Sequence, residues 1–289
     1  MLWITLSLLT ALATASQDAW VKRYFSHLST AEMTAFPFFY SIPMFAVVLP
    51  FVPVPELDEV FYWSFLLSLP LHIVPFFLHM KAIRSSDLSL TLPYLAFTPV
   101  FLILVGFVVL QEVPNGWGIA GILTTCAGGY ILNLKKGYHS LFAPIAAILR
   151  EKGSWLMLIV AFLYSVSGAV AKKAIVHSSP LFFTMSFFTV LGLVMTITMV
   201  LIGHARVSVL KKHIGKGIIA GALLFAHAAC HGFAISLTKA AYMISVKRLS
   251  VLIGFGYGWL IFKEKNVPVR LIGTVLMVAG AVLITLWGN

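Results

Sequence analysis

Apolar residues in this chain gather into long runs, and the short segments between the runs hold most of the charged residues. Ten such runs cover 3–22, 31–52, 61–80, 90–111, 115–134, 154–174, 180–203, 217–237, 241–262 and 268–287. An α-helix of about twenty residues crosses the hydrocarbon core of a bilayer. No segment alternates apolar and polar residues as the strands of a membrane β-barrel do. The pattern predicts an all-α membrane protein with ten transmembrane helices.

Residues 82–134 and 234–286 look like two copies of one sequence. Three residues of the first copy recur at the same spacing in the second: Glu112, Gly121 and Gly128 fall on Glu264, Gly273 and Gly280. A duplicated chain with five spans in each copy must have its halves inverted in the membrane, which is the plan of many secondary transporters. We expect a first five-helix repeat over 1–134, a connecting loop over 135–153 and a second five-helix repeat over 154–289.

The repeat extends toward the N-terminus of each copy. It aligns His79 with His231 and Thr98 with Ser250 without a gap. The register then slips slightly, so that 19–23 falls on 169–173. Equivalent positions can therefore be compared over most of the chain.

The composition supports a membrane environment. Hydrophobic residues make up 60% of the 289 residues and charged residues 10%, against roughly 25% charged residues in soluble domains. The two cysteines, Cys126 and Cys230, lie inside predicted helices and show no metal-binding spacing. We expect neither a structural disulfide nor a bound metal or cofactor.

Basic residues are distributed unevenly between the two predicted membrane faces. One face carries Lys22, Arg23, Lys81, Arg84, Lys135, Lys136, Arg150, Lys152, Arg206, Lys211, Lys212, Lys216, Lys263, Lys265 and Arg270. The other face, which includes both termini, carries Lys172, Lys173 and Lys239. The positive-inside rule places the first face in the cytoplasm and both termini outside the bacterial inner membrane. The net charge of +11 is then explained by contact with anionic lipids, without a nucleic-acid partner.

The segment that joins the two repeats has two interpretations. Residues 140–150 form an apolar stretch bordered by basic residues, with Pro144 near its start. This stretch is either a short helix lying in the membrane interface or a plain linker.

Several motifs resemble the EamA family of the drug/metabolite transporter superfamily. In the first copy they are Ala82-Ile83-Arg84-Ser85-Ser86-Asp87, Thr98-Pro99-Val100-Phe101 and Gln111-Glu112; in the second they are Ser245-Val246-Lys247-Arg248-Leu249-Ser250-Val251-Leu252, Gly258-Trp259 and Phe262-Lys263-Glu264. The resemblance covers nearly the whole chain. It implies a ten-helix inverted repeat around a central cavity and transport of a small metabolite without a cofactor. Many members of this family keep both termini in the cytoplasm, whereas the charges here indicate the opposite orientation.

Ionisable residues at membrane depth are costly and therefore mark candidate functional sites. Lys247 and Arg248 are expected about two turns inside the helix over 241–262. They would line the cavity and attract an anionic group of the substrate. Alternatively, Lys247 reaches the membrane interface and Arg248 binds helix-end carbonyls or a carboxylate.

Histidines are the second candidate group. His79 and His231 are equivalent in the repeat, and His227 lies one turn before His231 on the same helical face. These imidazoles can bind substrate or carry protons near neutral pH. A metal site would need a further carboxylate ligand that the sequence does not supply, and each histidine can also be a neutral residue bonded to a neighbouring carbonyl.

The acidic residues have more local interpretations. Asp18 either pairs with Lys22 one turn on or serves as a proton- or substrate-binding carboxylate. Glu32 is expected in the first turn of its helix, where the helix dipole favours an acid. Glu112 and Glu264 are expected to tether helix ends.

Tyrosines and glycines complete the expected site. Tyr94 and Tyr242, with other tyrosines such as Tyr164, are candidates for the walls of the cavity. Gly121, Gly128, Gly273 and Gly280 are expected to pack helices against one another.

Together, these features predict a secondary transporter for a small organic metabolite that carries a carboxylate or phosphate, such as an amino acid or organic acid. A flippase for a lipid-linked substrate and an exporter of cationic or amphipathic compounds are the alternatives. The chain lacks a P-loop, a G-x-S-x-G elbow and a His/carboxylate metal set, so we expect no enzyme. Its partners would be the substrate and membrane lipids, and it would act as a monomer or a homodimer.

Overall fold

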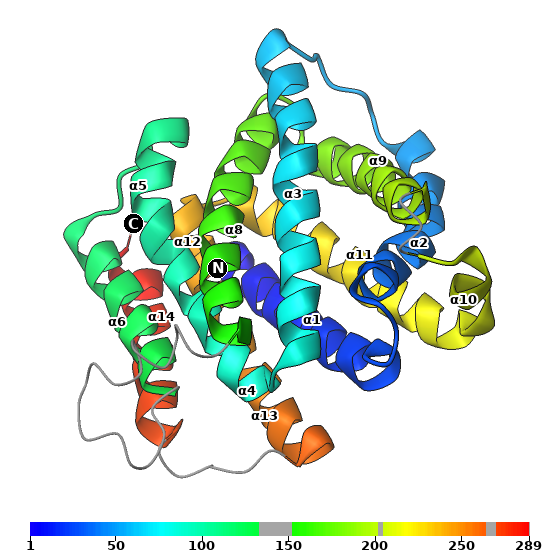
Figure 1. The fold of residues 1–289 in the computed structure, drawn as a ribbon. Helices are drawn as coiled ribbons and strands as arrows, with labels where there is room; N and C mark the ends of the chain where they lie inside the picture. Colours follow the sequence, from blue (N-terminus) through cyan, green and yellow to red (C-terminus); the bar gives the residue numbers. More distant parts are fainter. Residues whose placement is uncertain (133–151, 202–204, 264–269, 289) are drawn as a thin grey trace.

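The computed structural model describes residues 1–132, 152–201, 205–263 and 270–288, and within these ranges every regular element is a helix (Figure 1). The first half contains α1 (Leu2–Phe25), α2 (Thr30–Val48), η1 (Leu49–Phe51), α3 (Glu59–Ser85), α4 (Leu88–Thr91), η2 (Leu92–Phe97), α5 (Thr98–Leu110) and α6 (Gly116–Leu132). The second contains α8 (Lys152–Val176), α9 (Pro180–Leu201), α10 (Val207–Lys212), α11 (Ile214–Ser236), α12 (Ala240–Lys247), α13 (Ser250–Phe262) and α14 (Arg270–Trp287). The all-helical class is confirmed for these residues.

Among the described residues, seven helical segments are long and apolar enough to cross a membrane. They are Thr30–Phe51, Glu59–Ser85, Leu88–Leu110, Lys152–Val176, Pro180–Leu201, Ile214–Ser236 and Ala240–Phe262. Two further apolar helices, Gly116–Leu132 and Ile272–Trp287, are shorter. The chain is therefore an integral membrane protein. The expected interfacial segment 140–150 and Glu264 lie outside the described residues.

Local sequence signals fix where several helices begin. Ser29 and Glu32 form a capping box at the start of α2, since the Ser29 hydroxyl accepts the Glu32 N–H and the Glu32 carboxylate accepts the Ser29 N–H. Asp58 caps α3 by accepting the N–H of Phe61. The expected place of Glu32 in the first turn of its helix is confirmed.

Glycines bring α6 and α14 into backbone contact at one edge of the bundle, where Figure 1 shows the two helices side by side. A Cβ on Gly121 would lie 2.7 Å from the carbonyl oxygen of Gly280, and one on Gly128 would lie 2.6 Å from that of Gly273. The order of these contacts shows that the two helices run antiparallel. Because Gly121 is equivalent to Gly273 and Gly128 to Gly280, the pair is symmetric, and the expected packing role of these glycines is confirmed.

The helices expected over 90–111 and 241–262 are not continuous. The first divides into α4, the 3₁₀ segment η2 and α5, with Pro93 and Pro99 near the joints. The second divides between α12 and α13, where Arg248 is the C-cap of α12. Lys247 and Arg248 therefore lie at a helix break instead of inside a continuous helix. The breaks fall at equivalent places in the two repeats.

One pair of helix contacts departs from the symmetry of the repeats. α2 packs closely along α11, and a Cβ on Gly221 would lie 2.6 Å from the backbone of Tyr40. The equivalent pair, α3 and α9, meets mainly through side chains, with the ring of Phe65 5.3 Å from that of Phe187. In the register of the repeat, Phe65 occupies the position of Gly217. Phe65 thus keeps α3 and α9 apart, whereas the equivalent Gly217 allows α2 and α11 to approach each other closely.

Candidate functional site

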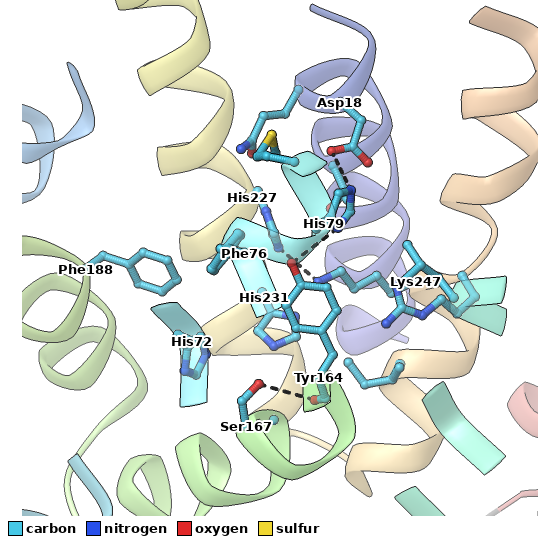
Figure 2. A pocket seen from close by; sticks show the side chains of 17 residues that line it. Asp18, His72, Phe76, His79, Tyr164, Ser167, Phe188, His227, His231 and Lys247 are labelled. Atoms are coloured by element: carbon cyan, nitrogen blue, oxygen red, sulfur yellow. Dashed lines mark hydrogen bonds and ion pairs between the residues drawn. The ribbon is translucent and has the colours of Figure 1, made fainter. Parts of the chain in front are cut away.

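A cavity lies between the two halves of the molecule and is lined by side chains from both (Figure 2). It is lined by Thr14, Gln17 and Asp18 of α1; His72, Phe76, His79 and Met80 of α3; Leu95 of η2; Tyr164, Ser167 and Gly168 of α8; Phe188 of α9; His227 and His231 of α11; and Ile244, Lys247 and Arg248 at the end of α12. Its volume is about 70 Å³. Small-molecule sites usually measure roughly 300–1,000 Å³, so an organic solute must widen this cavity.

The lining follows the repeat. Thr14 is equivalent to Tyr164, Gln17 to Ser167 and Asp18 to Gly168, while His79 is equivalent to His231 and Leu95 to Lys247; all ten residues line the cavity. The cavity therefore lies on the approximate twofold axis that relates the halves. Its charges are not symmetric, because Asp18 comes from the first repeat and Lys247 and Arg248 come from the second.

The helix break positions both cations. The Lys247 ammonium lies 2.9 Å from Nε2 of His227, and the Arg248 guanidinium donates from Nη2 to the Thr98 hydroxyl at 2.9 Å. Both side chains are buried and line the cavity. The expectation that Lys247 and Arg248 face a common interior space agrees with these contacts.

Asp18 of α1 lies beside His79 of α3. The carboxylate oxygen Oδ1 lies 3.2 Å from Nε2 of His79, at ion-pair distance but without good hydrogen-bond alignment. Nδ1 of the same ring lies 3.3 Å from the Tyr164 hydroxyl. Figure 2 shows these three side chains converging from α1, α3 and α8. No ion pair joins Asp18 to Lys22, the partner suggested by the sequence; the Lys22 ammonium donates to the Ser86 carbonyl at 2.6 Å.

Several polar atoms in the cavity wall are buried without a hydrogen-bond partner. They include Oε1 of Gln17, Nδ1 of His227, Nδ1 of His231 and Nε of Arg248. Buried polar atoms are normally satisfied, so such a concentration in one cavity indicates that a ligand or water completes their bonds. The wall offers donors and acceptors within an apolar frame that includes Phe76 and Phe188.

The other sequence candidates lie outside this cavity. Tyr242 is buried against Gly118, and its hydroxyl accepts the N–H of Asn115. Tyr94 is buried within η2. Glu112 is indeed a tether, although its partners come from the second repeat: it pairs with Lys172 and accepts the N–H of Ala240.

Sequence reasoning did not single out Gln17, Ser167 or Phe188. Gln17 is next to Asp18 in the sequence and is equivalent to Ser167 in the second repeat. The alignment of the two repeats could therefore have identified both residues. Among the described residues there is no group of three His, Cys, Asp or Glu side chains arranged to hold a metal ion.

These features define a polytopic helical membrane protein with a cavity between two related halves that is lined by charged, polar and aromatic side chains. The chain matches the EamA-like transporter family over residues 1–134 and 151–286 and belongs to that family. The resemblance noted in the sequence is thereby confirmed, and the protein is a membrane transporter of the drug/metabolite type.

Comparison with solved structures supports the fold. One solved structure, described only as "Crystal structure of protein", is similar with a TM-score of 0.68 over 98% of each chain, at 13% sequence identity. At that identity the similarity shows the fold alone. No curated protein matches the sequence.

Proposed function

We propose that the protein is a secondary transporter that carries a small organic anion, with a carboxylate or phosphate, across the bacterial inner membrane. The observation that carries this proposal is the pair Lys247 and Arg248, buried in the cavity between the two repeats. Among the described residues that line the cavity, Asp18 is the one carboxylate. One of the two cations thus has no carboxylate to balance it, and a bound anion would supply that charge.

The membrane arrangement in this proposal has ten spans in two inverted sets of five, with both termini outside. Contacts gather basic side chains at one end of the bundle, as this orientation requires. Lys22 bonds to Ser86, joining the end of α1 to that of α3, and the Lys216 ammonium lies 4.5 Å from the ring centre of Tyr24. We assign this end to the cytoplasm.

Alternating access would use the unequal helix pairs as gates. α2 and α11 pack closely, whereas aromatic rings fill the space between α3 and α9. If α3 and α9 came together while α2 and α11 separated, or the reverse, the cavity would open first to one side of the membrane and then to the other. The aromatic rings of Phe65 and Phe187 would form the gate on the side of Asp58.

The substrate is small and partly apolar in this proposal. A carboxylate or phosphate would bind the cations at the helix break, and the body of the solute would lie against Phe76, Phe188 and Tyr164. Amino acids and organic acids are the classes that fit. The restricted volume requires the helices to separate slightly when such a solute enters.

A thermal-shift screen of the detergent-purified protein tests the proposal. Metabolites are grouped as anions, zwitterions, cations and lipids, and Lys247→Met and Arg248→Gln are compared with Lys211→Met, which removes an exposed cation outside the cavity. Ligand at about 100 times its dissociation constant stabilises the native state by about 2.7 kcal/mol. We expect stabilisation by anions or zwitterions that is lost in the two cavity variants and kept in the control.

Other outcomes would favour the other candidate functions. Stabilisation by lipids alone would indicate a flippase, and equal stabilisation of all variants by cations would indicate an exporter of cationic compounds. Either result would overturn the anion site. Uptake of the identified ligand into proteoliposomes then establishes transport.

A further inference from the structure

We infer that Asp18 and His79 together form a proton-binding site, and that a proton and the substrate anion bind the cavity cooperatively. This inference rests on the proposed function, because it requires an anion at Lys247 and Arg248. The inference adds to the proposed function that the coupling ion is a proton and that Asp18 and His79 bind it.

The pair is placed where a proton and an anion can influence each other. Asp18 and His79 are both buried and both line the cavity. Their side chains come from α1 and α3, and Tyr164 of α8 completes the row from the second repeat. A change in the charge of this pair is therefore transmitted directly to the interface between the two halves.

The other three histidines of the cavity lining are less favourably placed than His79 to take up a proton. His227 faces the Lys247 ammonium at 2.9 Å, and a second positive charge there would be repelled. His72 donates from Nδ1 to the Ser68 carbonyl at 2.8 Å, and no described carboxylate lies within ion-pair distance of its ring to stabilise a positive charge. His231 lies beside His227 at a ring-centre distance of 6.0 Å, on the same cationic side. His79 alone among the four histidines of the lining has a carboxylate within ion-pair distance.

Tyr164 allows His79 to hold either protonation state without moving. When the ring is neutral and carries its hydrogen on Nε2, Nδ1 accepts a hydrogen bond from the Tyr164 hydroxyl. A protonated ring donates from Nδ1 to the phenolic oxygen instead, because the hydroxyl can act in both ways. Asp18 Oδ1 and His79 Nε2 lie 3.2 Å apart, so a single proton can be shared by the pair.

Electrostatic repulsion links the proton to the anion. With Asp18 ionised, the substrate anion is a second negative charge in a buried site of low dielectric, where it and Asp18 repel each other. A proton on the pair removes that repulsion. By linkage, the bound anion favours the proton and the proton favours the anion to the same extent.

The test measures anion affinity against pH in the full-length protein. Acetate, isovalerate and benzoate serve as probes, because carboxylic acids of this kind stay ionised between about pH 6 and 8. Isothermal titration calorimetry in buffers of different ionisation enthalpy counts the protons taken up for each anion bound. We expect affinity to rise by up to about tenfold for each unit of acidification, with up to about one proton taken up.

Variants identify the proton site. Asp18→Asn removes the charge that the proton would neutralise, so affinity should become independent of pH and equal that of the wild type in acid. His79→Gln should also abolish the pH dependence. Asp58→Asn is the matched control, because Asp58 is paired with His177 at 2.6 Å, outside the cavity. It should bind anions with the wild-type pH dependence.

The outcomes separate the two proposals. If an anion binds the wild-type protein with no pH dependence and no proton uptake, the proton site is refuted while the anion transporter stands. The same holds if both Asp18→Asn and His79→Gln keep the pH dependence. If no anion of these probes or of the metabolite screen binds at any pH, both proposals fail. Should Asp18→Asn not fold, His79→Gln and the wild-type proton count still decide.

Discussion

Gln111 and Lys263 occupy equivalent positions in the two repeats and share a left-handed backbone, with φ of 56° and 54°. They are the only non-glycine residues with positive φ in the described part of the chain. Each is the C-cap of its helix, and its N–H donates to the carbonyl of an equivalent glycine, Gly106 or Gly258. The two repeats thus agree in sequence and also in an unusual backbone conformation.

This conformation predicts how Gln111 tolerates substitution. Gln111→Val should lower the stability of the protein by about 1–2 kcal/mol, because a left-handed backbone is costly for a β-branched side chain. Gln111→Gly should be neutral or slightly stabilising, since glycine adopts positive φ without strain. Thermal unfolding in one detergent compares the two variants. Equal effects would contradict the assigned backbone conformation.

The contact between α6 and α14 predicts a sharp difference between two glycines. Gly280→Ala places a methyl group 2.5 Å from the Gly121 carbonyl oxygen, and we expect a loss of about 1–3 kcal/mol from overpacking. Gly256→Ala in α13 is the control, because a Cβ there has no neighbour within 4 Å. That change should be neutral or add up to about 1 kcal/mol of helix propensity. Midpoints of thermal unfolding distinguish the two cases, and a neutral Gly280→Ala would be evidence against the close packing.

The ion pair of Glu112 and Lys172 predicts non-additive mutations. Lys172 also donates to the Thr238 carbonyl, and Glu112 accepts the N–H of Ala240, so the pair joins α5, α8 and the start of α12. Loss of one partner of a buried pair costs up to about 3–5 kcal/mol. Glu112→Gln and Lys172→Met should each destabilise the protein, while the double variant should lose much less than their sum. Strict additivity in this double-mutant cycle would argue against direct pairing.

The aromatic contact between α3 and α9 predicts side-selective access to the cavity. Ser167→Cys, in a background without Cys126 and Cys230, reports access through labelling by a thiol reagent that does not cross membranes. Phe65→Ala should increase labelling from the side of Asp58, because it removes the ring that contacts Phe183 and Phe187. Phe107→Ala, on an exposed position of α5, should leave it unchanged. Equal labelling in all variants would rule out Phe65 as a barrier.

The exposed pair of Asp58 and His177 predicts a small acid-dependent contribution to stability. The N–H of Phe61, and then the His177 imidazole, hold the pKa of Asp58 below its ordinary value of 3.8. A lowered pKa favours the folded state above the ordinary pKa, and this benefit is lost as pH falls through the lowered value. Wild type should exceed Asp58→Asn in thermal midpoint near neutral pH, and the difference should vanish in strong acid. Glu56→Gln, on the same loop, should show no such loss.

The helical elements could be predicted from the sequence because long apolar runs have few alternatives in a membrane. Each predicted run overlaps a helix of the structure. The break at Lys247 and Arg248 could not be predicted in the same way. No proline stands at that point, and the apolar stretches before and after Lys247-Arg248 together have the length of a single membrane span. The equivalent break at η2 has two prolines nearby. Because the two repeats align, these prolines could have indicated a break at Lys247 and Arg248 as well.

The site was predictable in part. Buried ionisable residues identified Lys247, Arg248, His79, His227, His231 and Asp18, and all six line the cavity. The partners were harder to predict, since proximity in sequence favoured Lys22 for Asp18 whereas the structure pairs it with His79. Tyr94 and Tyr242 show the limit of residue type as a guide. A buried tyrosine in a membrane protein packs between helices as readily as it lines a cavity.

The placement of Asp18 in one repeat and Lys247 and Arg248 in the other has an evolutionary consequence. A symmetric dimer of the first half would face two carboxylates across its axis, and a dimer of the second half would face four cations. Two identical halves cannot place a carboxylate at one position and a cation at its symmetry-related position, whereas two diverged halves can. Divergence of the two copies therefore allowed a site that neither identical pair could form.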